Sequence, residues 1–136
     1  MIIPQNIIDG IVEQAFAGLP EEVCGLLVGR ENEVVERYPL TNIDHSPEHF
    51  SFDPKEQFQV LRKARSQGLR IIANYHSHPE TPARPSDEDI RLAYDPDIAY
   101  FILSLQDKEN PVLKAFSIKN GKTEEIELVL NNVLKK

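Results

Sequence analysis

Short apolar segments alternate with helical patterns along this chain, and that alternation constrains its fold more than any other feature. Residues 23–29, 71–78 and 98–105 have the length and side-chain content of strands. Between them, residues 7–19 repeat apolar side chains at helical spacing, and residues 54–67 follow a cap-and-proline helix start. Strands interleaved with helices predict a layered α/β domain.

The C-terminal part of the chain predicts a closing hairpin. Residues 112–118 and 123–129 have strand composition and flank Asn120 and Gly121, a common hairpin turn pair. A further strand is expected at residues 34–40. Because a hairpin joins antiparallel strands, the sheet should be mixed rather than purely parallel.

Composition limits the classes of protein that fit. The 136 residues suit one domain, expected to span 1–136, and the net charge is 15 minus 22, or −7. This acidity argues against nucleic-acid binding, which needs a surplus of Lys and Arg. Cys24 is the single cysteine, the first ten residues lack a secretory pattern, and no apolar run has membrane-spanning length. We therefore expect a cytoplasmic monomer or homodimer with no membrane partner.

Two histidines near the end of the strand at residues 71–78 form a candidate metal pair. His76 and His78 are two positions apart, so their side chains leave the same face of a strand. Their ring nitrogens can converge on one ion, whereas Ser77 points to the other face. A single strand histidine is usually structural, and the spacing of this pair alone leaves a metal site and a structural role both open.

Asp89 is a candidate third ligand with a competing structural explanation. It lies in the first turn of a short helix expected at residues 86–93, where Ser86 with an acid three positions later forms a capping pattern. The capping pattern alone would account for an acidic residue at position 89. The two roles are compatible, because a fixed first helical turn can hold a carboxylate at a metal.

Three protein ligands would leave a fourth position for water, the arrangement of a catalytic zinc. Such a site needs a base that takes a proton from water and delivers it to a leaving amine. Glu22 is the candidate, since it precedes a buried strand and should lie at the rim of the sheet. Spacing alone does not distinguish Glu22 from Glu21.

Other chemistry-bearing residues receive structural interpretations. Cys24 is expected in the core, and His45 and His49 in a solvated loop that Pro47 interrupts. Asn74 shares the face of the histidines and is expected beside them. A zinc nucleobase deaminase is set aside, because its motif needs a Cys-x-x-Cys pair that one cysteine cannot supply. A storage or sensor site would need four protein ligands.

The motifs together resemble the JAMM (MPN-plus) metalloprotease family. Its pattern is a glutamate ahead of a Gly-Leu-Leu strand, then His-Ser/Thr-His-Pro, then Ser-x-x-Asp. Here Glu22 precedes Val-Cys-Gly-Leu-Leu, His-Ser-His-Pro occupies 76–79, and Ser-Asp-Glu-Asp occupies 86–89. The first helix and residues 41–54 are also similar, so the likeness covers most of the chain.

The resemblance implies a fold and a set of roles. The fold would be an α/β three-layer sandwich, with a mixed, mostly antiparallel central sheet flanked by helices in the cytidine-deaminase-like manner. His76, His78 and Asp89 would hold one Zn²⁺, Glu22 would be the general acid/base, and Ser86 would donate a hydrogen bond to the oxyanion.

Family members cleave amide bonds after the C-terminal glycine of ubiquitin-like proteins. The chain is most similar to stand-alone prokaryotic members, some of which act on sulfur-carrier proteins. The resemblance thus implies a zinc isopeptidase whose substrate is such a C-terminal tail. Because a Gly-Gly tail has little side chain to recognise, we expect it to be held by strand addition along an exposed edge near residues 41–52 or 79–85. The alternative is a non-catalytic or partner-activated scaffold that binds proteins.

Overall fold

The computed structural model describes residues 1–131, and the last five positions of the expected single domain, 132–136, lie outside the described residues. In chain order the elements are β1 (Ile2–Pro4), α1 (Gln5–Gly18), β2 (Cys24–Arg30), β3 (Glu33–Leu40), α2 (Pro54–Ser66), β4 (Arg70–His78), α3 (Asp87–Arg91), β5 (Ala99–Ser104), β6 (Val112–Lys119), β7 (Lys122–Ile126) and β8 (Val129–Asn131). In this part of the chain no helix has the length and apolar character needed to cross a membrane.

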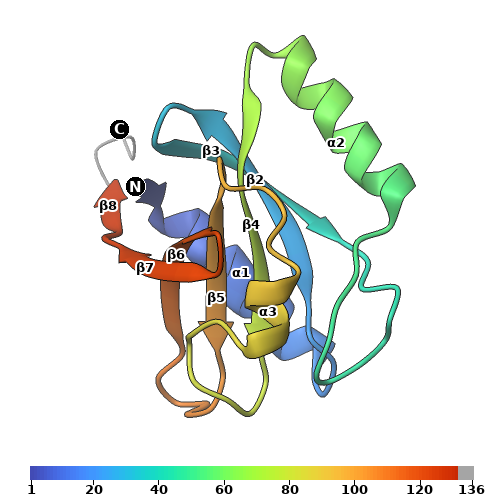
Figure 1. Cartoon of the computed structure of the whole chain (residues 1–136), viewed down its shortest axis with the longest axis vertical. Coiled ribbons are helices and arrows are strands. Elements are labelled where there is room, and N and C mark those ends of the chain that lie inside the picture. The colour runs from blue at the N-terminus through green and yellow to red at the C-terminus, as the bar shows by residue number, and fades with distance from the viewer. Residues whose placement is uncertain (132–136) are drawn as a thin grey trace.

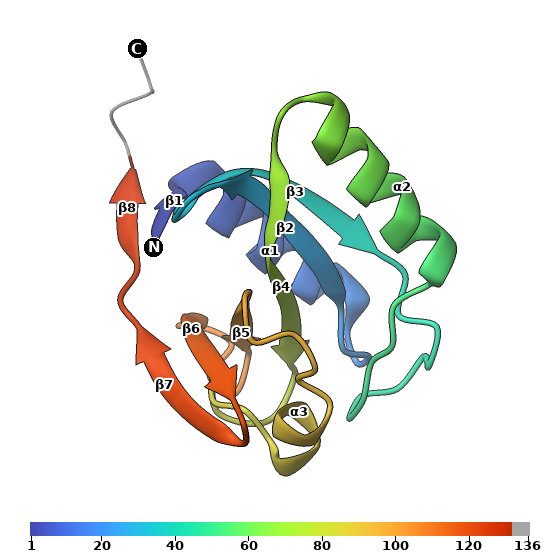
Figure 2. The same cartoon turned by 45° about the horizontal axis from the view of Figure 1, so that its top comes forward.

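The strands form one mixed sheet in the order β7-β6-β5-β4-β2-β3-β1-β8. Antiparallel pairs join β2 to β3 and β4, and β6 to β5 and β7, whereas β4–β5, β1–β3 and β1–β8 are parallel. Consecutive strands β7 and β8 lie at opposite ends of this order although only residues 127–128 separate them. The sheet must therefore curl round on itself, as Figure 2 shows.

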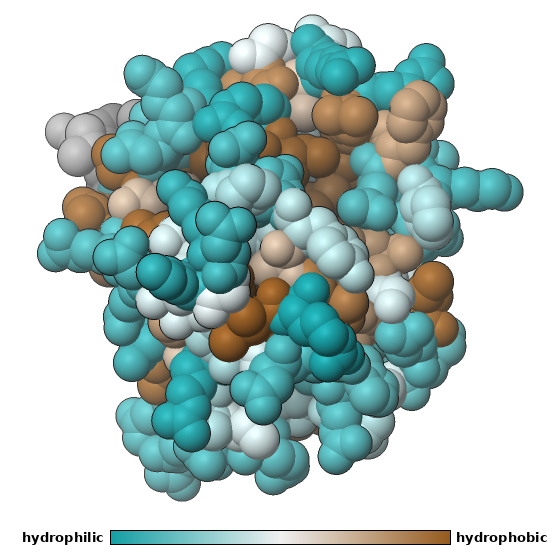
Figure 3. Space-filling view, in the orientation of Figure 1, coloured by the Kyte–Doolittle hydropathy of each residue, from teal (hydrophilic) through white to brown (hydrophobic). Residues whose placement is uncertain are grey.

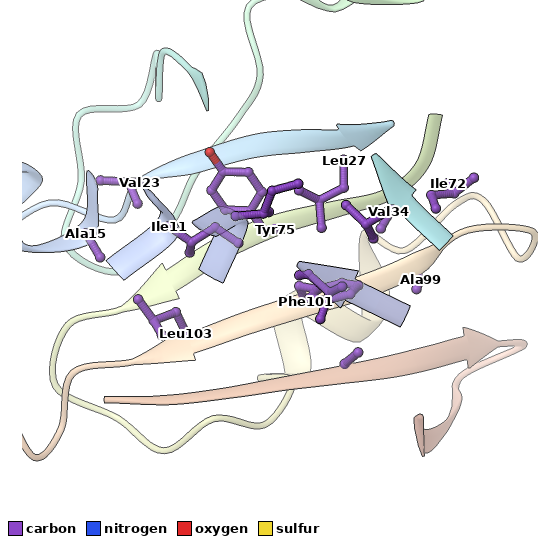
Figure 4. Close-up of a cluster of buried hydrophobic side chains, with 14 of the residues drawn as sticks. Ile11, Ala15, Val23, Leu27, Val34, Ile72, Tyr75, Ala99, Phe101 and Leu103 are labelled. Atoms are coloured by element: carbon purple, nitrogen blue, oxygen red, sulfur yellow. The ribbon is translucent and has the colours of Figure 1, made fainter. Parts of the chain in front are cut away.

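Helix α1 covers one face of the curled sheet and closes the larger core. Its buried side chains are Ile7, Ile11 and Ala15, which recur at the spacing of one helical face. They pack with sheet residues that include Tyr75 and Phe101, both fully buried. Figure 4 shows this cluster between α1 and the strands. Removal of this apolar surface from water is the main driving force for the fold.

Helices α2 and α3 lie on the other face, separated from each other (Figure 1). Val60 and Ala64 of α2 pack on a cluster that includes Cys24 and Leu26 of β2. Ile90 of α3 packs on a separate cluster over β5 and β6. The two helices therefore cover different parts of this face, α2 over β2 and the start of β4 and α3 over β5 and β6. Helices on both faces of a mixed sheet confirm the expected three-layer α/β architecture.

Most of the expected elements are confirmed within a few residues at their ends. Asp53 caps α2 by accepting a hydrogen bond from the Lys55 amide at 2.9 Å, and the turn after β6 places Asn120 and Gly121 at positive φ. The expectation omitted β1 and β8. Each has only three residues, too few to show a period, and they pair with each other from opposite ends of the chain.

Candidate metal centre

Strand β4 ends with the two histidines on the face of the sheet that also carries α2 and α3. Both side chains are buried, with His76 2% and His78 5% exposed. Ser77 between them points the other way, and its hydroxyl accepts a 2.8 Å hydrogen bond from the Val23 amide. This bond ties the end of β4 to the residue before β2. The alternation expected from a strand therefore brings the two imidazoles together.

Asp89 reaches the same place from α3. Its amide donates to the Ser86 hydroxyl at 3.0 Å, and its carboxylate oxygen Oδ2 accepts from the Ser86 amide at 2.9 Å. These two bonds form the capping box that the sequence indicates. The same Oδ2 atom lies 3.1 Å from His76 Nε2 and from His78 Nε2. Capping therefore holds the carboxylate beside the histidines rather than competing with that role.

The three ligand atoms form an almost equilateral triangle. His76 Nε2 and His78 Nε2 are 3.1 Å apart, the same distance that separates each from Asp89 Oδ2. An ideal tetrahedral zinc site with bonds of about 2.0–2.1 Å has ligand–ligand edges of about 3.3–3.4 Å. Two imidazole nitrogens and one carboxylate oxygen also form a donor set suited to zinc. The residues present therefore fit that ion, and they leave one tetrahedral position open.

A backbone carbonyl fixes the orientation of one histidine. His78 Nδ1 lies 2.9 Å from the Pro82 carbonyl oxygen, which can only accept, so Nδ1 carries the proton and donates it. The Nε2 lone pair then points to the centre of the triangle, as metal binding requires. His76 Nδ1 is buried and has no hydrogen-bond partner among residues 1–131.

Without a metal, the electrostatics of the cluster favour the ligating states of Asp89 and His76, whereas they favour the protonated state of His78. Burial alone would raise the pKa of Asp89, but in the metal-free protein His76 and His78, which donate to its carboxylate when Nε2 is protonated, outweigh burial and hold this pKa well below its usual range. Burial lowers the pKa of His76, so its ring is neutral near pH 7. Burial also opposes charge on His78, but Asp89 and the Pro82 carbonyl raise the pKa of His78 overall.

Glu22 is a buried carboxyl group beside this cluster. It is 6% exposed, and burial raises its pKa from 4.5 to about 8, with the charges of His78 and Asp89 acting in opposite directions. Cys24 pairs with His76 across β2 and β4, so Glu22 lies at the carboxyl end of β4, level with His78. A carboxyl with a pKa near the working pH suits general acid–base chemistry.

The structure separates Glu22 from its neighbour Glu21, which the sequence could not do. Glu21 is partly exposed, and its carboxylate lies 3.5 Å from His45 Nδ1 at the surface. The Glu22 backbone, in contrast, is bonded twice to the loop between β3 and α2. Its amide donates to the Ser46 carbonyl at 2.9 Å, and its carbonyl accepts from Asn42 Nδ2 at 3.0 Å.

The same loop supplies contacts that the sequence analysis missed. The ring of Phe50 stacks on His76 with centroids 4.5 Å apart and an interplanar angle of 22°. The next residue back, His49, reaches across to α3, where its Nδ1 lies 2.9 Å from Glu88. Phe50 and Phe52 are apolar residues in an otherwise polar segment, and this contrast was the available clue. His45 and His49 lie in an exposed loop, as expected.

Cys24, which pairs with His76 across β2 and β4, and Tyr75, which precedes His76 on β4, have structural roles. Cys24 is fully buried, and burial raises the pKa of its thiol to about 12, so it carries no thiolate at neutral pH. Tyr75 points to the face opposite the histidines, where its hydroxyl bonds to Gln14. Asn74 shares the face of His76, as expected, and is 9% exposed.

Comparison with known proteins agrees with this geometry. Residues 4–119 match a family described as prokaryotic homologs of the JAB domain. The chain is 33% identical over 123 residues to the CysO-cysteine peptidase of Mycobacterium tuberculosis, covering 89% of this chain and 84% of that protein. It is 34% identical over 103 residues to the desampylase of Haloferax volcanii, covering 71% and 74%.

Among solved structures, the solution structure of protein DSY2949 from Desulfitobacterium hafniense is similar. It superposes with a TM-score of 0.91 at 44% sequence identity, over 99% of this chain and 96% of that one. The family resemblance expected from the motifs is thereby confirmed. This chain belongs to the family of prokaryotic homologs of the JAB domain, the stand-alone branch of the JAMM metalloproteases.

Proposed function

We propose that this protein is a zinc-dependent peptidase that hydrolyses the amide bond after the C-terminal glycine of a ubiquitin-like or sulfur-carrier protein. One observation supports this activity above all others. Three ligand atoms at mutual distances of 3.1 Å leave one tetrahedral position open, and a buried carboxyl group lies beside them. A closed structural site would have four protein ligands and no adjacent base.

His76, His78 and Asp89 would hold the ion. When bound, zinc polarises the scissile carbonyl and lowers the pKa of water to about 7. The Ser86 amide and the Pro82 carbonyl keep Asp89 and His78 aimed at the centre, so the ligands need little rearrangement when the ion arrives.

Glu22 takes the proton of the attacking water and returns it to the leaving nitrogen. In the metal-free protein, burial holds the pKa of Glu22 at about 8, so this carboxyl group can take up and release a proton near neutral pH. The Ser86 hydroxyl uses its oxygen to accept from the Asp89 amide, so its own proton is free to be donated to the oxyanion of the substrate. One side chain thus caps α3 and contributes to transition-state stabilisation.

The substrate class rests on the relatives. Two of them are named for peptidase action on CysO-cysteine and for desampylation. We extend this class to the present chain, with the protein acting in the cytoplasm as one domain over residues 1–136, as a monomer or homodimer.

The test is cleavage of a sulfur-carrier protein extended by a few residues beyond its Gly-Gly terminus. Intact mass spectrometry would follow the reaction with zinc-loaded protein, after chelation, and after zinc is restored. Loss of the extension only when zinc is present would support the proposal. Zinc binding without cleavage of any extended carrier would contradict it and favour a partner-activated or non-catalytic scaffold.

A further inference from the structure

A groove follows β4 between α2 and α3, and side chains of both helices line it. Its volume is about 700 Å³, within the range of ligand sites, and it reaches from His76 and Asp89 at one end to Arg70 at the other. Apolar side chains make up much of its lining, including Leu26, Ile71 and Ile102. Hydrophobic residues are visible in the area between α2 and α3, surrounded by hydrophilic ones (Figure 3). We call this groove, which extends along β4 from His76 and Asp89 to Arg70, the upstream groove.

The placement of Glu22 determines which part of a substrate enters the upstream groove. Glu22 lies level with His78, the last residue of β4, and is not among the residues that line the groove. A base that protonates the leaving nitrogen must be within hydrogen-bond reach of that atom. The leaving group therefore lies on the Glu22 side, and the acyl part, which precedes the scissile bond, extends along β4 into the groove.

Asn74 gives the groove one buried polar group. Its side chain lies on the groove wall and is only 9% exposed, yet its Oδ1 atom has no hydrogen-bond partner anywhere in residues 1–131. Buried polar atoms are nearly always paired, so an unpaired one in a ligand-sized hollow indicates a missing partner. Asn74 is two positions from His76, or about 7 Å along the strand. In an extended substrate whose scissile bond lies beside His76, the second or third residue before that bond is therefore level with Asn74.

Two arginines mark the far end of the groove. Arg65, in the last turn of α2, and Arg70, at the start of β4, both line it, and neither has an ion-pair partner in the described part of the chain. On the α3 wall the acid Glu88 is already paired with His49. Arg70 is six residues from His76, about 20 Å along the strand, which corresponds to about six residues of extended peptide.

We propose that the upstream groove selects the substrate tail: an apolar side chain ahead of Gly-Gly fills the hollow, Asn74 bonds its main chain, and Arg65 and Arg70 bind an acidic residue four to six positions before the scissile bond. This proposal rests on the peptidase function above and adds a charge preference to it. Arg65 and Arg70 place positive charge without an ion-pair partner among residues 1–131 on an otherwise acidic protein, and this local charge favours an acidic occupant.

The test uses synthetic peptides ending in Leu-Gly-Gly-Cys with three Asp, three Asn or three Lys residues directly ahead of the leucine. With zinc-loaded protein, kcat/KM for the Asp peptide should exceed that for the Lys peptide by about tenfold or more. In the Arg65→Gln/Arg70→Gln double variant the ratio should fall below about twofold, with the Asn peptide little affected. Arg62→Gln is the matched control, because Arg62 is on the same helix but lies over the Phe58 ring.

A binding measurement tests the charge preference of the groove without any need for cleavage. Fluorescein-labelled peptides that end at Leu-Gly-Gly are titrated with protein and followed by anisotropy. The Asp peptide should bind about tenfold tighter than the Lys peptide, and the preference should vanish in the double variant. Asn74→Ala should weaken binding of all the peptides alike while leaving the zinc content and the charge preference intact.

The outcomes separate the two proposals. Equal cleavage and equal binding of the Asp and Lys peptides would overturn the charge selection while leaving the peptidase in place. Charge-selective binding without any zinc-dependent cleavage would leave the groove in place and overturn the peptidase. A preference that persists in the double variant would show that other residues carry it.

Discussion

Replacement of Glu22 by glutamine should make the metal-free protein more stable, and increasingly so as the pH rises. The reason is the buried carboxyl group, whose pKa is about 8 in the folded protein against an ordinary value of 4.5. Between these two values the unfolded chain has lost this proton and the folded chain still holds it. Fewer protons bound in the unfolded state mean that the free energy of unfolding falls as the pH rises.

The magnitude follows from this gap. One pKa unit corresponds to about 1.4 kcal/mol, so the gap between 4.5 and about 8 sets an upper limit of about 5 kcal/mol. Between pH 5 and pH 8 the linkage relation gives a loss of about 3 kcal/mol for wild-type protein. Glutamine has no proton to lose, so the variant avoids that loss. Contributions from His76, His78 and Asp89 are common to both proteins and largely cancel.

The assay is urea unfolding at pH 5 and pH 8 in the presence of a chelator. The stability of Glu22→Gln relative to wild type should rise by about 3 kcal/mol between the two pH values. Glu21→Gln is the matched control, because it removes the adjacent, partly exposed carboxylate, and it should show a much smaller change. A change below about 0.5 kcal/mol for Glu22→Gln would refute the assignment of Glu22 as a buried, proton-retaining carboxyl group.

Three further predictions concern the ligands, the cap and the core. His78→Ala should reduce zinc content, measured by elemental analysis, from one equivalent to about a tenth or less, since two ligands hold the ion poorly; retention of a full equivalent would contradict the assigned triangle. Ser86→Ala should lower kcat by about 10²–10³ and stability by about 1 kcal/mol, with Ser86→Thr restoring much of both. A loss of stability with kcat unchanged would mean that Ser86 only caps α3 and does not stabilise the oxyanion. Gly25→Ala should cost about 1–3 kcal/mol in urea unfolding, because its new Cβ would lie 2.3 Å from Tyr75 Cζ; an unchanged midpoint would mean that the Tyr75 ring can shift freely.

Sequence patterns predicted the parts of the fold that rest on local rules. Hydrophobic periodicity located α1, turn chemistry located the β6–β7 hairpin, and the cap at Asp53 located the start of α2. The pairing of β1 with β8 was not predictable in this way. It joins the two ends of the chain through three-residue strands, and only the curl of the whole sheet brings them together.

The candidate site shows the same division between local and tertiary information. The spacing of His76 and His78 predicted their shared face, and the Ser86 cap predicted where Asp89 would be held. The choice of Glu22 over Glu21 needed burial, which depends on how the β3–α2 loop folds back over the strand end. The stacking of Phe50 on His76 depends on the same loop and has no local sequence rule.

The central claim is that His76, His78 and Asp89 hold the metal while Glu22 moves the proton. One experiment tests both parts: zinc content and cleavage of a Gly-Gly-extended carrier protein, measured on the same preparations of wild type and Glu22→Gln. The account predicts equal zinc in both proteins and at least about a hundredfold slower cleavage by the variant. Full cleavage by a zinc-loaded Glu22→Gln protein would contradict it, because the proton would then have to move through another group.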